Sequence, residues 1–108
     1  MSLRPVEFHV LLALADEERH GYAILQEVAH VTDGDLQLEA GTLYRALHRM
    51  LKDGWIAEST RRPAADVDDE RRKYYRLTSL GRRLASAEAD RLWRLVTVAR
   101  SRRLVGRA

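Results

Sequence analysis

The sequence contains no cysteine, only two prolines among its 108 residues, and no long hydrophobic run. Without cysteine, the chain can form neither a disulfide scaffold nor a thiolate zinc site. No apolar stretch approaches the roughly 18–20 residues of a membrane span, and residues 1–5 lack the apolar segment of a signal peptide. We therefore expect a soluble cytoplasmic protein of one domain, with at most one appended element.

The sequence also lacks the residue patterns that enzymes and metal sites require. Its four histidines are scattered along the chain, and no pair has the spacing of a helical zinc motif. No glycine-rich phosphate loop ends in lysine, and no serine stands in the context of a hydrolase nucleophile. We predict that the protein is not an enzyme and uses no metal ion or cofactor.

Charge is distributed unevenly along the chain, although the net charge is only +3. Residues 1–40 hold two bases and eight acids, whereas residues 71–108 hold twelve bases and two acids. A basic second half favours a polyanionic partner such as nucleic acid. A solvated arginine-rich helix would give the same distribution and is the alternative.

Hydrophobic periodicity and turn residues predict four helices and two strands. The helices are expected at residues 6–14, 21–31, 39–52 and 80–103, the strands at 55–61 and 73–77, and a polar break at 16–21. Pro5 suits the first turn of the first helix, Gly54 ends the third, and Thr78 or Ser79 caps the fourth. This order predicts a mainly α fold with a small β-hairpin. We expect a winged helix-turn-helix DNA-binding domain over residues 1–78 and a long C-terminal dimerisation helix over 79–108.

The third predicted helix has the features of a DNA-reading helix. Leu43, Leu47 and either Met50 or Leu51 recur at helical spacing and are expected to face the core. The opposite face carries Thr42, Tyr44, Arg45, His48, Arg49 and Lys52. A helix fits the major groove, where arginine can donate to O6 and N7 of guanine. An ordinary amphipathic helix with a solvated basic face is the alternative.

The predicted hairpin supplies a second basic surface. Its stem carries Arg61, Arg62, Arg71, Arg72 and Lys73, which could clamp phosphates or lie along a minor groove. The polar tip, residues 63–70, holds four acids that oppose DNA, so we assign contacts to the stem and not to the tip. A solvated hairpin balanced by its own acids is the alternative.

The long final helix carries an apolar stripe that one small domain cannot bury. The stripe contains Leu84, Ala85, Ala89, Leu92, Val96 and Ala99. Packing against the same helix of a second subunit would bury these side chains and give a C2 homodimer. The alternative is a monomer in which this helix folds back along the first helix.

Four short motifs follow one another along the chain. They are HGYAI at residues 20–24, GTLYRAL at 41–47, DGWI at 53–56, and RKYYRLT at 72–78 with Gly81. In this order they resemble the PadR family of transcriptional regulators, and the single helix that follows resembles its short subfamily. The resemblance implies a homodimeric repressor of a nearby operon that binds an inverted-repeat operator in double-stranded DNA. Members of the family often respond to phenolic or drug-like ligands.

The resemblance also implies residue roles. It places DNA contacts on Tyr22, Thr42, Tyr44, Arg45, Arg49, Arg72 and Lys73. In some members a tryptophan of the last helix stacks on planar ligands, and Trp93 lies about one residue beyond that position. One residue turns a helical side chain by about 100°, so we favour dimer packing by Trp93 over a small aromatic ligand there. The alternative function is a winged-helix module that binds proteins and not DNA, against which the basic third helix argues.

Overall fold

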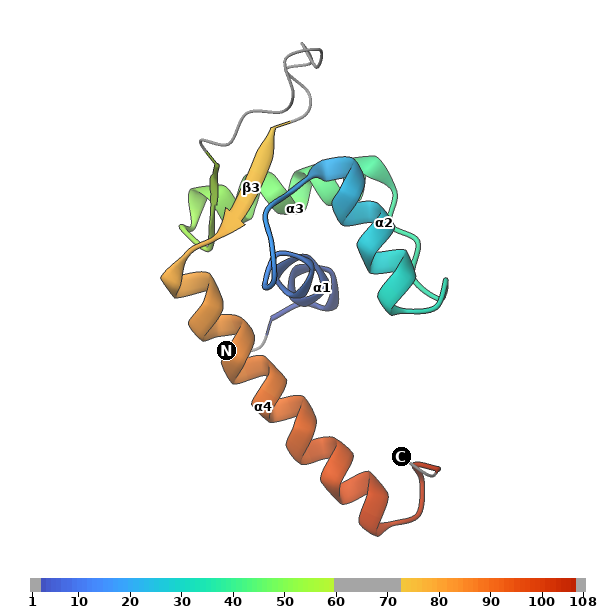
Figure 1. Cartoon of the computed structure of the whole chain (residues 1–108). Helices are drawn as coiled ribbons and strands as arrows, with labels where there is room; N and C mark the ends of the chain where they lie inside the picture. The colour runs from blue at the N-terminus through green and yellow to red at the C-terminus, as the bar shows by residue number, and fades with distance from the viewer. Residues whose placement is uncertain (1–2, 60–72, 107–108) are drawn as a thin grey trace.

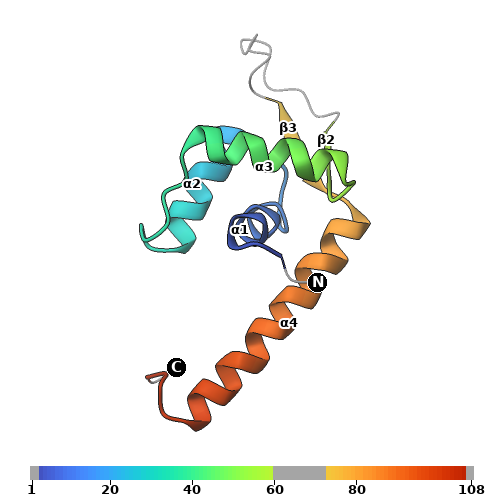
Figure 2. The ribbon, with the colours of Figure 1, turned by 180° about the vertical axis from the view of Figure 1, so that it is seen from behind.

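The computed structural model describes residues 3–59 and 73–106. Three short helices pack around one another, a small sheet lies beside the third, and the last helix extends away as an arm (Figures 1 and 2). The elements are α1 (Pro5–Ala13), β1 (Arg19–His20), α2 (Gly21–Val31), α3 (Ala40–Lys52), β2 (Ile56–Glu58), β3 (Tyr74–Leu77) and α4 (Ser79–Ser101). The expected fold class, mainly α with a small β element and a long last helix, is confirmed.

The bounds of the short helices agree with the sequence prediction to within one residue. Pro5 is the first residue of α1, where its missing N–H costs no hydrogen bond. Gly54 follows α3 with a φ of +80°, a left-handed conformation that glycine adopts without strain. Helix α4 ends at Ser101, two residues before the predicted end.

The core forms where the apolar faces of α1, α2 and α3 meet. The largest fully buried side chains include Leu11, Ile24, Leu43, Leu47 and Met50. Met50, and not the partly buried Leu51, is the third core residue of α3. Burying side chains of this size contributes about 1.5–3 kcal/mol each, so these contacts hold the three helices together.

The sheet has three antiparallel strands in the order β1-β3-β2, one strand more than the predicted hairpin. The extra strand lies within residues 16–21, so the prediction of a plain polar break there is wrong. Arg19 pairs with Tyr75, and His20 pairs with Tyr74. A strand of two residues is too short to show an alternating pattern in the sequence. It is a strand because the distant β3 pairs with it.

The direction in which α4 leaves the domain is fixed by its N-cap, Thr78. The Thr78 hydroxyl accepts from the N–H of Gly81 at 3.1 Å and donates to the carbonyl oxygens of Gly54 and Trp55 at 2.6 and 2.9 Å. The cap of α4 is thereby joined to the turn that follows α3.

Among the described residues, none of the helices combines the length and the apolar character that a membrane span requires.

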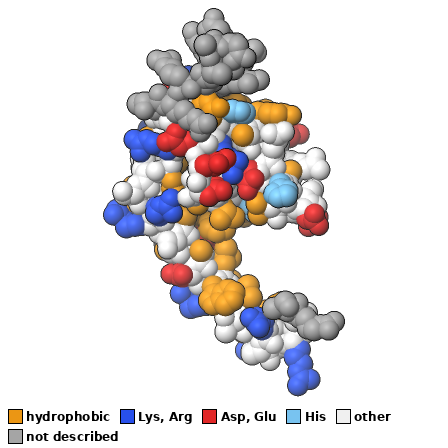
Figure 3. Space-filling model, in the orientation of Figure 1, with side chains coloured by type: hydrophobic (Ala, Val, Ile, Leu, Met, Phe, Trp, Pro, Cys, Tyr) orange, Lys and Arg blue, Asp and Glu red, His pale blue; other side chains and the backbone are white. Residues whose placement is uncertain are grey.

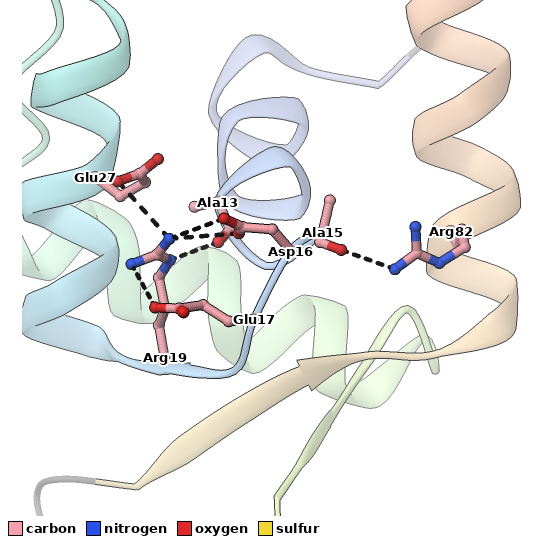
Figure 4. Close-up of polar contacts among 7 residues, drawn as sticks. All are labelled: Ala13, Ala15, Asp16, Glu17, Arg19, Glu27 and Arg82. Atoms are coloured by element: carbon pink, nitrogen blue, oxygen red, sulfur yellow. Dashed lines mark hydrogen bonds and ion pairs between the residues drawn. The ribbon is translucent and has the colours of Figure 1, made fainter.

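Two arginines hold the C-terminal end of α1, as Figure 4 shows. The Nε atom of Arg19 donates to the Ala13 carbonyl at 2.7 Å, and Nη2 of Arg82, from α4, donates to the Ala15 carbonyl at 2.9 Å. Arg19 also forms ion pairs with Asp16, Glu17 and Glu27 at 3.2–3.8 Å. Because cations favour helix C-terminal ends, these contacts fix α1 against both α2 and α4.

Candidate nucleic-acid interface

The exposed face of α3 is basic. Arg45, His48 and Lys52 lie three or four residues apart on one side of the helix, and all three are exposed. The residues that α3 buries, Leu43, Ala46, Leu47 and Met50, occupy the opposite side. No acidic residue occurs within α3. The three predicted DNA contacts at the centre of this face are therefore accessible to a large partner.

Tyr44 lies on one flank of the basic face and packs over the first residue of α2. A Cβ atom added at Gly21 would overlap with the Tyr44 hydroxyl and would lie 2.8 Å from its Cζ atom. Gly21 therefore allows α3 to approach the N-terminus of α2. Tyr44 remains 44% exposed, and Tyr22, next to Gly21 in the chain, is 64% exposed.

His20, which precedes Gly21, is a structural residue. Its Nδ1 atom accepts from the N–H of Ala23 at 3.1 Å and so caps α2. Its ring packs edge-on against that of Tyr74, with 5.3 Å between the ring centroids. The first motif of the sequence, HGYAI, thus joins the start of α2 to β3 and to α3.

Arg49 lies on the other flank and has its partner inside the fold. Its Nε and Nη2 atoms donate to Oε2 of Glu7 in α1 at 3.1 and 2.9 Å. The side chain of Arg49 is 42% exposed, whereas that of Glu7 is only 7% exposed. The sequence analysis assigned no role to Glu7. Its position could have been noticed in the sequence, because Glu7 is the only acidic residue of an otherwise largely apolar α1.

Only part of the predicted wing lies in the described residues. Lys73 is exposed and forms an ion pair with Glu58 across the strands at 3.8 Å. The other predicted wing contacts, Arg61, Arg62, Arg71 and Arg72, lie outside the described residues, as does the acidic tip. The buried Tyr75 anchors β3. Burial, followed by the neighbouring Tyr44 and Glu58, raises the pKa of its hydroxyl.

Helix α4 divides into a packed part and an exposed part. Leu84 and Ala85, two of the predicted dimer contacts, pack against the core of their own chain. Farther along α4, Ala89 and Val96 are exposed, and Leu92 and Ala99 are partly buried. Trp93 is 61% exposed and Leu95 54%. Figure 3 shows hydrophobic surface along this arm, which nothing in the described chain covers.

Among these surfaces, the basic face of α3 is the one suited to binding a partner. Within residues 3–59 and 73–106, no three histidine, aspartate or glutamate side chains come together as a metal site. A shallow depression between α1 and α2 is lined by His9, Leu12, Ala13, Glu27, Val28 and Val31. By contrast, the α3 face offers cationic hydrogen-bond donors on a rigid helix, which suits a polyanion.

Comparison with known proteins identifies the family of this fold. The model of the transcriptional regulator PadR-like family matches residues 10–87, which is more than half of the chain. A solved structure of a transcriptional regulator from Clostridium thermocellum is similar, with a TM-score of 0.69 and 26% identity over 90% of this chain and 87% of that one.

Two curated proteins are more similar in sequence. The chain is 36% identical over 74 residues to a protein from Lysinibacillus sphaericus named "Uncharacterized protein X", covering 68% of this chain and 64% of that protein. It is also 36% identical over 77 residues to the transcriptional regulator Rv3488 of Mycobacterium tuberculosis, covering 71% and 65% respectively. The chain thus matches slightly less than two thirds of the length of each relative.

Proposed function

The chain belongs to the PadR-like family of transcriptional regulators, and from this premise we propose that it is a homodimeric repressor that binds an inverted-repeat operator in double-stranded DNA. The observation that carries the proposal is the accessible, acid-free outer face of α3. Helix α3 enters the major groove, where Arg45 donates to a guanine edge. His48 and Lys52 contact the groove or its phosphates.

The flanks of α3 complete this surface. Thr42, Tyr44 and the exposed Tyr22 lie near the edges of the basic face and contact the DNA backbone. Lys73 adds a phosphate contact from the wing stem, together with Arg61 and Arg72. Held on both flanks, α3 meets DNA without first having to become ordered, which reduces the entropy cost of binding.

Dimerisation uses the exposed part of α4. Val96 and its apolar neighbours Trp93 and Leu95 find no cover within the described chain, and a second α4 would bury them. A C2 dimer presents two α3 helices to half-sites one helical turn apart, about 34–36 Å. Leu84 and Ala85 support this arm from the core side, and Ala89, Leu92 and Ala99 face the partner.

The α4 interface also offers a route to regulation. The angle between the two α4 helices sets the distance between the two α3 helices. A planar aromatic ligand that stacks on Trp93 and favours one angle changes operator affinity by its differential affinity for the two states. The repressor is thereby released from DNA in the cytoplasm when such a ligand is present.

The proposal is tested by fluorescence anisotropy with a labelled duplex from the promoter region next to the gene, and with a random duplex of equal length. We expect specific binding whose affinity falls steeply with salt, because each subunit neutralises several phosphates. If the chain binds neither duplex even at low salt, the proposal is wrong, and a winged helix that binds proteins becomes the better account.

A further inference from the structure

The carboxylate of Glu7 is buried and uses both of its oxygens. Oε1 accepts from the backbone N–H of Arg4 at 3.0 Å, at the start of α1. Oε2 accepts from Nε and Nη2 of Arg49, in the last turn of α3, at 3.1 and 2.9 Å. A single buried side chain therefore joins the first turn of α1 to the helix proposed to read DNA.

This contact constrains orientation as well as distance. The guanidinium group is planar, and two donors from one of its edges share a single carboxylate oxygen, Oε2, which limits the directions in which Arg49 can point. A buried carboxylate is costly without its cation, so the pair resists separation. The contact spans 42 residues of sequence, and it therefore holds two separate helices together.

Arg49 and Tyr44 contact the rest of the fold on opposite flanks of α3. Arg49 lies one helical turn after Arg45 and on the flank opposite Tyr44, which is fixed against Gly21. Arg45, His48 and Lys52 lie between these two flanks on the same rigid helix. A rotation of α3 about its axis would therefore displace all three from the bases or phosphates that they contact.

We propose that Glu7 is a positioning residue for DNA recognition: through Arg49 it sets the rotation of α3, and Arg49 acts through this contact and does not read a base. The inference rests on the DNA-binding function proposed above. It assigns a role in specificity to a carboxylate that is too buried to touch DNA.

The direction in which Glu7→Gln changes the affinity for the operator separates this positioning role from a simple effect of charge. Glu7→Gln removes a negative charge, so electrostatics alone predicts equal or tighter binding to every duplex. Loss of positioning predicts weaker binding to the operator and unchanged or tighter binding to random DNA. We expect the ratio of operator to random affinity to fall about tenfold, the effect of losing one good base contact.

Arg49 variants test the second half of the proposal. Arg49→Lys keeps the charge but not the planar pair of donors, so it should lower the affinity ratio as Glu7→Gln does. The double variant Glu7→Gln/Arg49→Lys should lose no more than either single variant, because both remove the same contact. Arg49→Lys should show the same salt slope of operator binding as Glu7→Gln, because Arg49 itself contacts no phosphate and both variants keep every cation of the α3 face.

A stability control excludes general loosening of the fold. Val10→Ala, three residues after Glu7 on α1, removes buried methyl groups but leaves every hydrogen-bonding atom of the pair in place. It should lower the unfolding midpoint and leave the affinity ratio unchanged when binding is measured well below that midpoint. Glu7→Gln should lower the ratio under the same conditions, with the variant shown to be folded by circular dichroism.

The possible outcomes are distinguishable. If Glu7→Gln keeps the wild-type affinity ratio, the positioning role is wrong. It is also wrong if Arg49→Lys alone changes the salt slope, which would make Arg49 a phosphate contact. If the wild-type chain shows no preference for any promoter duplex over random DNA, the failure lies in the proposed function and not in the role of Glu7.

Discussion

Tyr44 of α3 and Gly21 of α2 are in such close contact that no methyl group fits between them. Gly21→Ala should therefore force either the Tyr44 ring or the start of α2 to move. We expect a loss of about 1–3 kcal/mol in the free energy of unfolding, as for other overpacked sites. Urea denaturation followed by circular dichroism measures this loss.

The double variant Gly21→Ala/Tyr44→Ala is the control for this contact. Removing the ring makes room for the new methyl group, so the double variant should lose less than the sum of the two single losses. Strictly additive losses would show that the two residues do not constrain each other.

Arg45 and Lys52 should differ in what they contribute to DNA binding. Arg45→Ala should reduce discrimination between the operator and a duplex with one changed half-site base pair by about 1–3 kcal/mol. Lys52→Ala should weaken binding to all duplexes alike and lower the salt slope by about one. Competition binding with single-site operator variants distinguishes the two effects. If Arg45→Ala weakens binding equally at every sequence, Arg45 is a phosphate contact.

Val96 tests the dimer through a single exposed side chain. Val96→Glu should give a folded monomer, because it places a charge in the proposed α4 interface without disturbing the core of its own chain. Analytical ultracentrifugation measures the change. Arg94→Gln, on the opposite side of α4, alters the net charge by the same amount and should remain a dimer. A dimeric Val96→Glu protein would place the interface elsewhere.

The stabilising contribution of Glu88 should be lost at acid pH. Arg91 donates to both of its carboxylate oxygens, at 2.9 and 2.6 Å, and this hydrogen bonding lowers the pKa of Glu88 below its usual value of 4.5. The unfolded chain therefore takes up this proton first as the pH falls. The contribution is present above about pH 4.5 and is lost as the pH falls through the lowered pKa of the folded state.

Unfolding midpoints measured between neutral pH and about pH 3 test this dependence. Glu88→Gln should make the stability less dependent on pH in the acid range. Asp90→Asn is the matched control, because it removes a carboxylate from the same helix without touching the Arg91 pair. If the stability of Glu88→Gln depends on acid pH as that of the wild type does, the pair with Arg91 contributes nothing to stability.

Trp93 can report on an effector directly. In a Trp55→Phe background it is the only tryptophan, and a planar aromatic ligand that stacks on it should quench its fluorescence in a saturable way. Prior binding of the operator should lower the affinity of the protein for this ligand, because linkage between the two sites is reciprocal. If no phenolic or planar compound changes emission or operator affinity, Trp93 serves dimer packing alone.

Local patterns in the sequence were sufficient for much of the fold. The apolar periodicity of α1, α2 and α3, the glycine after α3 and the threonine before α4 each act within a few residues, so helix bounds and core faces were predictable. The same periodicity separated the buried Leu43 and Leu47 from the exposed Arg45, His48 and Lys52, but it left open whether Met50 or Leu51 completes the core face. The family motifs pointed to the same architecture.

Contacts between distant residues were decided by the tertiary structure alone. Strand β1 exists because β3 pairs with it, Arg49 is held by a carboxylate 42 residues away, and Leu84 packs on its own core although its spacing also suited a dimer stripe. Periodicity states which side of a helix is apolar or basic, but not which element meets it. The sequence therefore determined the helices and their faces, and packing decided the third strand and which charged and apolar side chains remained free for a partner.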